Sequence, residues 1–313
     1  MLPLDTITAV ARETACESWD VAAQSASTVT SDSDASTFMP ATANHDIERY
    51  LKTGDYDPHF AGWPGDFMDR ARLAESELKQ ALIAEVRRRT THATAREIVA
   101  NVDVVGFTRR KVEPMVRGLF ARAEQEAVLA MLEQSVVFLG SANIFDVIAK
   151  ADWLHTARHL ANLFLVSADA ELLDADAPNL VGLSEETTCY VSMTYFDRGG
   201  RFEDFLVHEA AHVFHNCKRH TVGLPETRRR EWLLDIEFRK RETFAYACEA
   251  YSRLLELGQR RSSRKSLLLE LTGDPAPLEG RVDRDEYVDI LREAVSARNG
   301  WKRILARCAP QRR

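Results

Sequence analysis

Two histidines stand four residues apart in the segment FLVHEAAHVFHN, and a glutamate directly follows the first of them. Residues four apart lie one above the other on an α-helix, so the side chains of His208 and His212 would point the same way. The rest of the segment is largely apolar, which predicts a buried helix. Two imidazoles and a carboxylate are costly to bury unless they share a partner. The segment therefore predicts a buried helix that carries a metal site.

The pattern H-E-x-x-H on a helix is typical of a zinc site, because both imidazoles reach one ion from the same face. Glu209 would then point to the side on which a water on the ion lies, which makes it the expected general base. The chain has nine histidines, and chance would produce the pattern about 0.02 times in a sequence of this length. The alternative is an ordinary helical core in which these polar groups satisfy one another.

A zinc ion held in this way needs a third protein ligand. The downstream segment ETFAYACE offers two acids, Glu242 and Glu249, which are aligned on a helical wheel opposite a stripe that contains Phe244 and Cys248. Because this helix would be apolar nearly all round, both acids need to be neutralised or paired. The spacing alone leaves both open as the third ligand.

H-E-x-x-H followed about 30 residues later by E-x-F-A resembles the gluzincin branch of the zincin metallopeptidases. The resemblance covers residues 188–255 and implies two helices that face each other across one zinc ion. It implies that His208, His212 and Glu242 are the ligands and that Glu209 is the general base. Glu249 then becomes an alternative ligand, or a support for a ligand histidine.

The activity that this resemblance implies is zinc-dependent hydrolysis of a peptide bond in a peptide or protein substrate. Asn216 extends the match to H-E-x-x-H-x-x-x-N, an arrangement found in zinc aminopeptidases, although the distance along the chain to Glu242 is longer here. The chain lacks the H-x-x-G-x-x-H continuation of the metzincin branch. Zincins often place a Tyr or His beyond the motif to stabilise an oxyanion, and Tyr246 and His220 are the residues expected in that role.

Alternating side chains from Thr188 to Phe196 predict a β-strand, with a turn at 197–200 and then a helix from Arg201 or Phe202. We expect this strand to present an open edge beside the metal helix, where an extended peptide can add by backbone hydrogen bonds. The residues expected to form the wall of that substrate site are Tyr190, Ser192 and Thr194, or their alternates.

The remaining pattern predicts a predominantly helical α+β protein in three parts. Residues 1–45 are expected to be a flexible tail rich in Ser, Thr and Asp, because 21–45 holds few large apolar side chains. Residues 46–175 are expected to form a mainly helical region, and 176–313 a zincin-like domain with a small sheet. Helical periodicity predicts one helix after an Asp66 N-cap, one over 112–134 and one over 143–164.

Charge and cysteine content narrow the classes of partner. Residues 218–265 carry 13 basic against 7 acidic side chains, so a nucleic-acid-associated protein is one alternative, although no aromatic interleaving or known module supports it. A zincin-like protein that binds zinc without catalysis is the other. No run approaches the roughly 18 apolar residues of a membrane helix, and no membrane partner is expected. Five scattered cysteines without a C-x-x-C pair favour a reduced, cytoplasmic protein.

Overall fold

The computed structural model describes residues 41–93, 103–174, 182–185, 187–196, 200–228, 230–273 and 282–310. Within these ranges the fold is α+β and predominantly helical. The helices are α1 (Ala41–Thr53), α2 (Phe67–Arg89), α3 (Val104–Leu119), α4 (Arg122–Ser135), α5 (Ile144–Lys150), α6 (Leu154–Ser167), α7 (Phe205–Asn216), α8 (Arg241–Leu257), α9 (Arg261–Gly273), α10 (Arg284–Ser296) and α11 (Gly300–Cys308). The strands are β1 (Val136–Leu139), β2 (Gly182–Glu185) and β3 (Thr188–Ser192).

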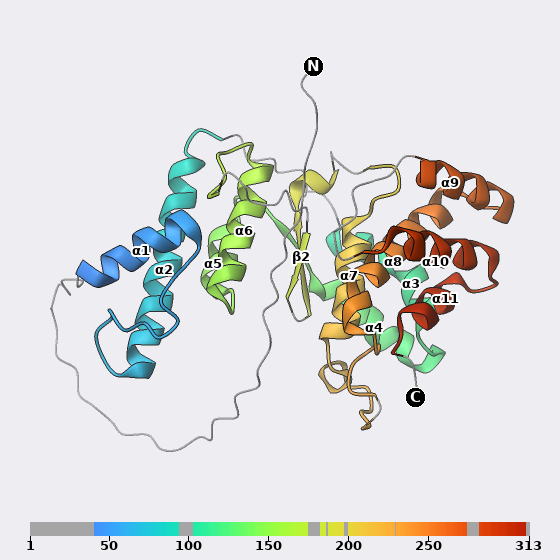
Figure 1. Ribbon diagram of the computed structural model, residues 1–313, viewed down its shortest axis with the longest axis horizontal. Coiled ribbons are helices and arrows are strands. Elements are labelled where there is room, and N and C mark those ends of the chain that lie inside the picture. The colour runs from blue at the N-terminus through green and yellow to red at the C-terminus, as the bar shows by residue number, and fades with distance from the viewer. Residues whose placement is uncertain are drawn as a thin grey trace.

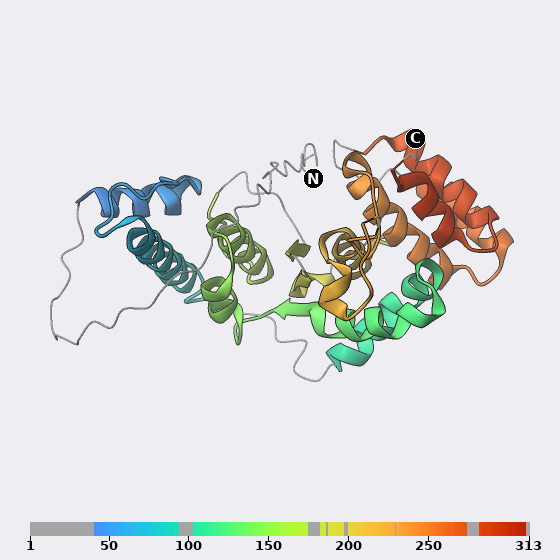
Figure 2. The same cartoon turned by 90° about the horizontal axis from the view of Figure 1, so that it is seen from below.

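Two groups of helices lie on either side of the small sheet (Figures 1 and 2). One group, α1, α2, α5 and α6, buries its apolar side chains in what we call the N-terminal core. The other group, α3, α4 and α7 to α11, builds the C-terminal core. Because α3 and α4 belong to the second group, the cores do not divide the chain at the predicted boundary between 175 and 176.

The three strands form one sheet in the order β1-β3-β2. β1 runs parallel to β3, with Val136 opposite Cys189, whereas β2 runs antiparallel to β3, with Gly182 opposite Val191. β3 therefore has a neighbour on both sides, and the expectation that it presents an open edge is wrong. The alternating pattern correctly indicated a strand, but it contains no information about which strands flank it.

Two of the predicted helices are each divided in two by contacts with distant residues. The predicted helix over 112–134 is interrupted at Phe120, where the backbone is extended. There α11 approaches, and Asn299 and Lys302 donate to the carbonyls of Gly118 and Leu119 at the end of α3. The predicted helix over 143–164 is interrupted at Ala151, whose carbonyl accepts a 2.6 Å hydrogen bond from Lys79.

The first residues of the helices agree with their N-cap residues better than the predicted helix lengths agree with the structure. Asp66 accepts hydrogen bonds from the backbone of Met68 and Asp69, which confirms the predicted N-cap of α2. Helix α7, which carries the H-E-x-x-H motif, begins at Phe205, a few residues later than predicted, because Asp204 provides its cap. Residues 41–45 belong to α1 rather than to a tail, whereas the rest of the predicted tail lies outside the described residues. So does most of the predicted turn at 197–200.

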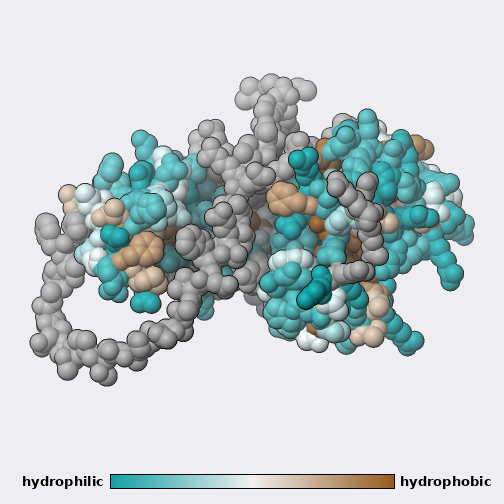
Figure 3. Space-filling view, turned by 60° about the horizontal axis from the view of Figure 1, so that its bottom comes forward, coloured by the Kyte–Doolittle hydropathy of each residue, from teal (hydrophilic) through white to brown (hydrophobic). Residues whose placement is uncertain are grey.

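None of the described helices combines the length and the apolar character that a membrane crossing requires. Hydrophilic residues prevail on the face shown in Figure 3, where hydrophobic ones form small separate patches. Cys189, Cys217, Cys248 and Cys308 are buried, and none of these four described cysteines forms a disulfide with another.

Candidate metal centre

α7 is held in place by the buried residue Asp204. Its carboxylate caps α7 at the Val207 amide, accepts a 3.0 Å hydrogen bond from Tyr195 and forms a 2.8 Å ion pair with Lys111 of α3. Its own backbone N–H donates to Glu249 of α8 at 2.7 Å. A buried carboxylate is stable only when it is paired and hydrogen-bonded in this way. Asp204 therefore fixes the start of the metal helix against two other helices.

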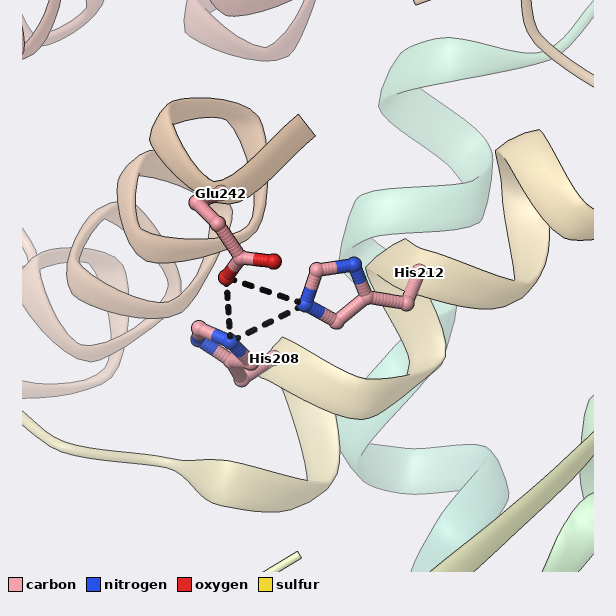
Figure 4. Close-up of side chains that lie close together, drawn as sticks. All are labelled: His208, His212 and Glu242. Atoms are coloured by element: carbon pink, nitrogen blue, oxygen red, sulfur yellow. Dashed lines mark hydrogen bonds and ion pairs between the residues drawn. The ribbon is translucent and has the colours of Figure 1, made fainter. Parts of the chain in front are cut away.

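His208 and His212 of α7 and Glu242 of α8 point toward one another (Figure 4). The two Nε2 atoms are 3.1 Å apart, and Glu242 Oε2 lies 3.7 Å from His208 Nε2 and 3.5 Å from His212 Nε2. Zinc binds such ligands at about 2.0–2.2 Å in tetrahedral geometry, which separates neighbouring ligand atoms by about 3.3 Å. The three observed separations lie close to that value.

Glu249 does not join this group but lies behind His208. Its Oε2 is 3.0 Å from His208 Nδ1, the ring nitrogen that faces away from Glu242, and its Oε1 accepts from the backbone of Asp204. Seven residues separate the two acids on α8, so they contact the same imidazole from opposite ends. The two acids that the sequence left open as ligands thus occupy different positions: Glu242 faces both Nε2 atoms, and Glu249 contacts the opposite side of the His208 ring.

His212 has a different partner behind it. Its Nδ1 lies 3.1 Å from Nε2 of His215, whose own Nδ1 lies 3.0 Å from the side-chain oxygen of Asn216. Only 4% of His215 is exposed. Burial, together with the neighbouring His212, lowers the pKa of His215 to about 2, so this ring is neutral.

These hydrogen-bond partners fix where the ring protons lie. A carboxylate only accepts hydrogen bonds, so His208 carries its proton on Nδ1. The Asn216 oxygen also only accepts, so His215 is protonated on Nδ1 and accepts at Nε2 from Nδ1 of His212. In their neutral forms, both motif histidines therefore turn an unprotonated Nε2 toward the same carboxylate oxygen. Two nitrogen lone pairs and an anionic oxygen repel one another unless a cation lies among them, so the donor set fits zinc.

A proton is the other cation that this arrangement favours. Burial acts to lower the pKa of His208, but its hydrogen bonds with Glu242 and Glu249 outweigh burial and raise the pKa well above the ordinary value. Burial likewise acts to raise the pKa of Glu242, but the adjacent His212 and the hydrogen bonds to both imidazoles lower it. Metal and proton therefore compete for the same place, as they do in protein metal sites generally.

Glu209 lies between the metal helix and the sheet, and only 8% of it is exposed. It packs on Gly182 of β2, where an added Cβ would lie 2.7 Å from Glu209 Cγ, and it hydrogen-bonds to the Ser184 side chain. Burial raises the pKa of Glu209, while the two motif histidines partly offset that rise. A buried carboxylate with a raised pKa is a stronger base than an exposed one.

The structure separates the two residues expected to stabilise an oxyanion. Tyr246, one helical turn after Glu242, has its ring 4.6 Å from that of His208, in an edge-to-face arrangement. His220 is 61% exposed and lies 3.0 Å from Glu226. Its partner is thus a surface acid rather than the metal-binding group, and the expectation for His220 gains nothing from the structure.

The residues predicted to form a substrate wall do not form one. Ser192 and Thr194 are buried, and their hydroxyl groups hydrogen-bond to each other. Tyr190 packs against the N-terminal core. The strand also ends at Ser192, and a 3-10 helix follows over Met193–Phe196. These side chains pack inside the protein because β3 is the central strand of the sheet. The alternation of residues along β3 does not reveal that position.

Sequence reasoning missed three residues that contact the site. Asp204 was detectable, because an Asp directly before an apolar helical segment is an N-cap signal. Gly182 and Ser184 support Glu209 from β2, and no local pattern pointed to them because the contact depends on how the sheet meets α7.

Comparisons with protein families, with curated proteins and with solved structures produce no match for this chain.

Proposed function

We propose that this protein is a zinc-dependent peptidase of the zincin type with a gluzincin-like ligand set. The observation that carries the proposal is the convergence of His208 Nε2, His212 Nε2 and Glu242 Oε2 at separations of 3.1 to 3.7 Å. These separations match three corners of a zinc tetrahedron and leave the fourth position for water, as in catalytic zinc sites. Bound zinc would supply a water of lowered pKa and a Lewis acid for the scissile carbonyl.

Glu209 is proposed as the general base. It takes a proton from the attacking water and returns it to the leaving amine, an exchange that typically contributes about 10²–10⁴-fold to the rate. The contacts with Gly182 and Ser184 hold its carboxylate in one orientation. Tyr246 lies beside His208 and is proposed to donate a hydrogen bond to the developing oxyanion.

β2 replaces β3 as the strand proposed to guide the substrate. Among the described strands it lies at one edge of the sheet, with β3 as its neighbour. Its residues Gly182 and Ser184 contact Glu209, so an extended peptide added along β2 would pass close to the proposed base. Backbone hydrogen bonds along this edge would bind peptides with little dependence on their side chains.

The test combines metal analysis with peptide cleavage. The full chain is loaded with zinc and incubated with a mixed peptide library, and products are identified by mass spectrometry. Glu209→Gln is expected to retain one zinc per chain and to lose about 10²–10⁴-fold in cleavage rate. Glu231→Gln, a substitution at a glutamate that is 49% exposed, serves as the matched control and is expected to cleave normally.

Two other outcomes would redirect the assignment. A chain that binds zinc but cleaves no peptide would be a zincin-like binding or regulatory protein. Salt-sensitive binding of DNA or RNA that chelators leave unchanged would favour the nucleic-acid alternative. The basic region gives that alternative little support, because Arg219 and Arg230 both pair with Glu124, and Lys240 pairs with Glu286.

A further inference from the structure

The two motif histidines are supported by different chemical groups. Behind His208 lies the carboxylate of Glu249, whereas behind His212 lies the imidazole of His215. Zinc-binding histidines usually donate their second ring N–H to a carboxylate, a backbone carbonyl or a water. A second histidine in that place is therefore a distinctive feature of this chain.

The geometry of the His215 contact is that of a directed hydrogen bond. The centroids of the His212 and His215 rings are 5.2 Å apart and the ring planes are at 83°, which is a T-shaped arrangement. The nitrogen atoms are 3.1 Å apart, within the normal range for N–H donation to an acceptor. On the opposite side of the ring, Asn216 Oδ1 accepts a hydrogen bond from Nδ1 of His215 at 3.0 Å, which leaves Nε2 of His215 to accept from His212.

We infer that His215 is a positioning residue, which holds His212 in the metal-binding tautomer through the chain His212–His215–Asn216. This inference rests on the zinc ligand set of the proposed function, but not on peptide hydrolysis. A neutral imidazole orients His212 without adding a negative charge. Three acids already surround the site, since Glu209, Glu242 and Glu249 all interact with His208. A fourth carboxylate would reduce the electrophilic character of the metal.

The experiment measures zinc affinity of the full chain by competition with a chromophoric chelator, together with the visible absorption of the Co²⁺-substituted protein. His215→Met fills a similar volume but cannot accept from Nδ1 of His212, and it is expected to weaken zinc binding about 10–100-fold. His215→Gln can place an amide oxygen near the position of Nε2, and it is expected to retain affinity within about threefold. His45→Met, a substitution at an exposed histidine of α1, is the matched control.

Cobalt absorption provides a readout that a purely structural role would not change. His215→Met should alter the ligand-field bands, whereas His215→Gln should restore them, because only the orientation of His212 differs between the two. Wild-type affinity and wild-type bands in a folded His215→Met protein would overturn the inference. If that variant does not fold, Asn216→Ala decides the question. Removal of the acceptor for His215 should weaken zinc binding by a smaller factor. Unchanged zinc affinity would contradict the hydrogen-bond chain His212–His215–Asn216.

The failure of this inference is distinct from the failure of the proposed function. If the wild-type chain binds zinc and cleaves no peptide, the proposed peptidase function is wrong, but the proposed role of His215 is unaffected. A wild-type chain that binds no zinc removes both.

Discussion

The Arg158 network of the N-terminal core and the His208–His212–Glu242 group of the C-terminal core both bury polar side chains, but they satisfy them in opposite ways. In the N-terminal core Arg158 donates to the carbonyls of Tyr50 and Leu51 and pairs with Asp174. Each of these groups around Arg158 faces a partner of complementary character. In the C-terminal core the Nε2 atoms of two histidines lie 3.1 Å apart, beside a carboxylate, and they need a metal ion or a proton between them.

This difference distinguishes buried polar groups that stabilise the fold from buried polar groups that are arranged to bind a ligand. A buried network of donors and matching acceptors stabilises the fold without any added component. A buried group of acceptors alone is costly, and it persists only because the surrounding structure enforces it and a cation can neutralise it. The four predictions below test this distinction in the two cores, in order of decreasing effect.

Removal of the carboxylate that faces both histidines should have the largest effect. A structural zinc site is worth roughly 10–16 kcal/mol, so one ligand in four corresponds to roughly 3–4 kcal/mol. Glu242→Gln is therefore expected to weaken zinc binding about 10²–10³-fold, as measured by chelator competition. Glu249→Gln should lose only about 10–100-fold, because it acts through His208. The reverse order would make Glu249 the ligand.

The N-terminal network should respond in stability rather than in metal binding. Arg158→Met leaves the buried carbonyls of Tyr50 and Leu51 without their donor, and it is expected to lower the free energy of unfolding by about 3 kcal/mol. Urea denaturation measures the change, and zinc affinity should stay constant. Arg88→Met, at an arginine that is 67% exposed, is the control and should cost less than about 1 kcal/mol.

A methyl group placed against the proposed base should affect activity more than metal binding. In Gly182→Ala the added Cβ would lie 2.8 Å from Oε1 of Glu209, so the carboxylate has to move. A displacement of about 1 Å can cost about 10²-fold in rate, and we expect a loss of that size in peptide cleavage with zinc retained. Gly140→Ala, where an added Cβ meets no atom within 4 Å, should behave as the wild type. Equal losses of cleavage rate in both variants would show that the contact between β2 and Glu209 does not contribute to catalysis.

The smallest effect concerns acid stability in the N-terminal helices. Hydrogen bonds from Arg88, and from Arg89, lower the pKa of Glu85 from 4.5 to about 2. Because the pKa of Glu85 is lowered, its interactions with Arg88 and Arg89 stabilise the fold above pH 4.5. This contribution is lost as the pH falls from 4.5 towards 2. Glu85→Gln should remove that part of the pH dependence, with a change of about 0.5 kcal/mol. Thermal melts between pH 6 and pH 2.5 compare the two proteins; identical pH profiles would contradict the prediction.

Local patterns predicted part of the fold well. The Asp66 cap and the strand from Thr188 depend on residues adjacent in sequence, and both are found where the pattern indicated. The breaks at Phe120 and Ala151 were not predicted. Lys302 donates to Leu119 beside the first break and Lys79 donates to Ala151 at the second, and both lysines are distant in sequence. Likewise, the pairing of β3 on both sides is a property of the sheet rather than of the strand.

Spacing along the chain places His208, Glu209 and His212 on one helix, and because the two histidines are four residues apart, helical geometry alone gives them a common direction. Spacing likewise aligns the two acids on a second helix. It does not establish that Glu242 faces the two Nε2 atoms while Glu249 and His215 lie behind the rings. Those assignments depend on how α7 and α8 cross, and helix crossing is set by the packing of side chains from the whole core.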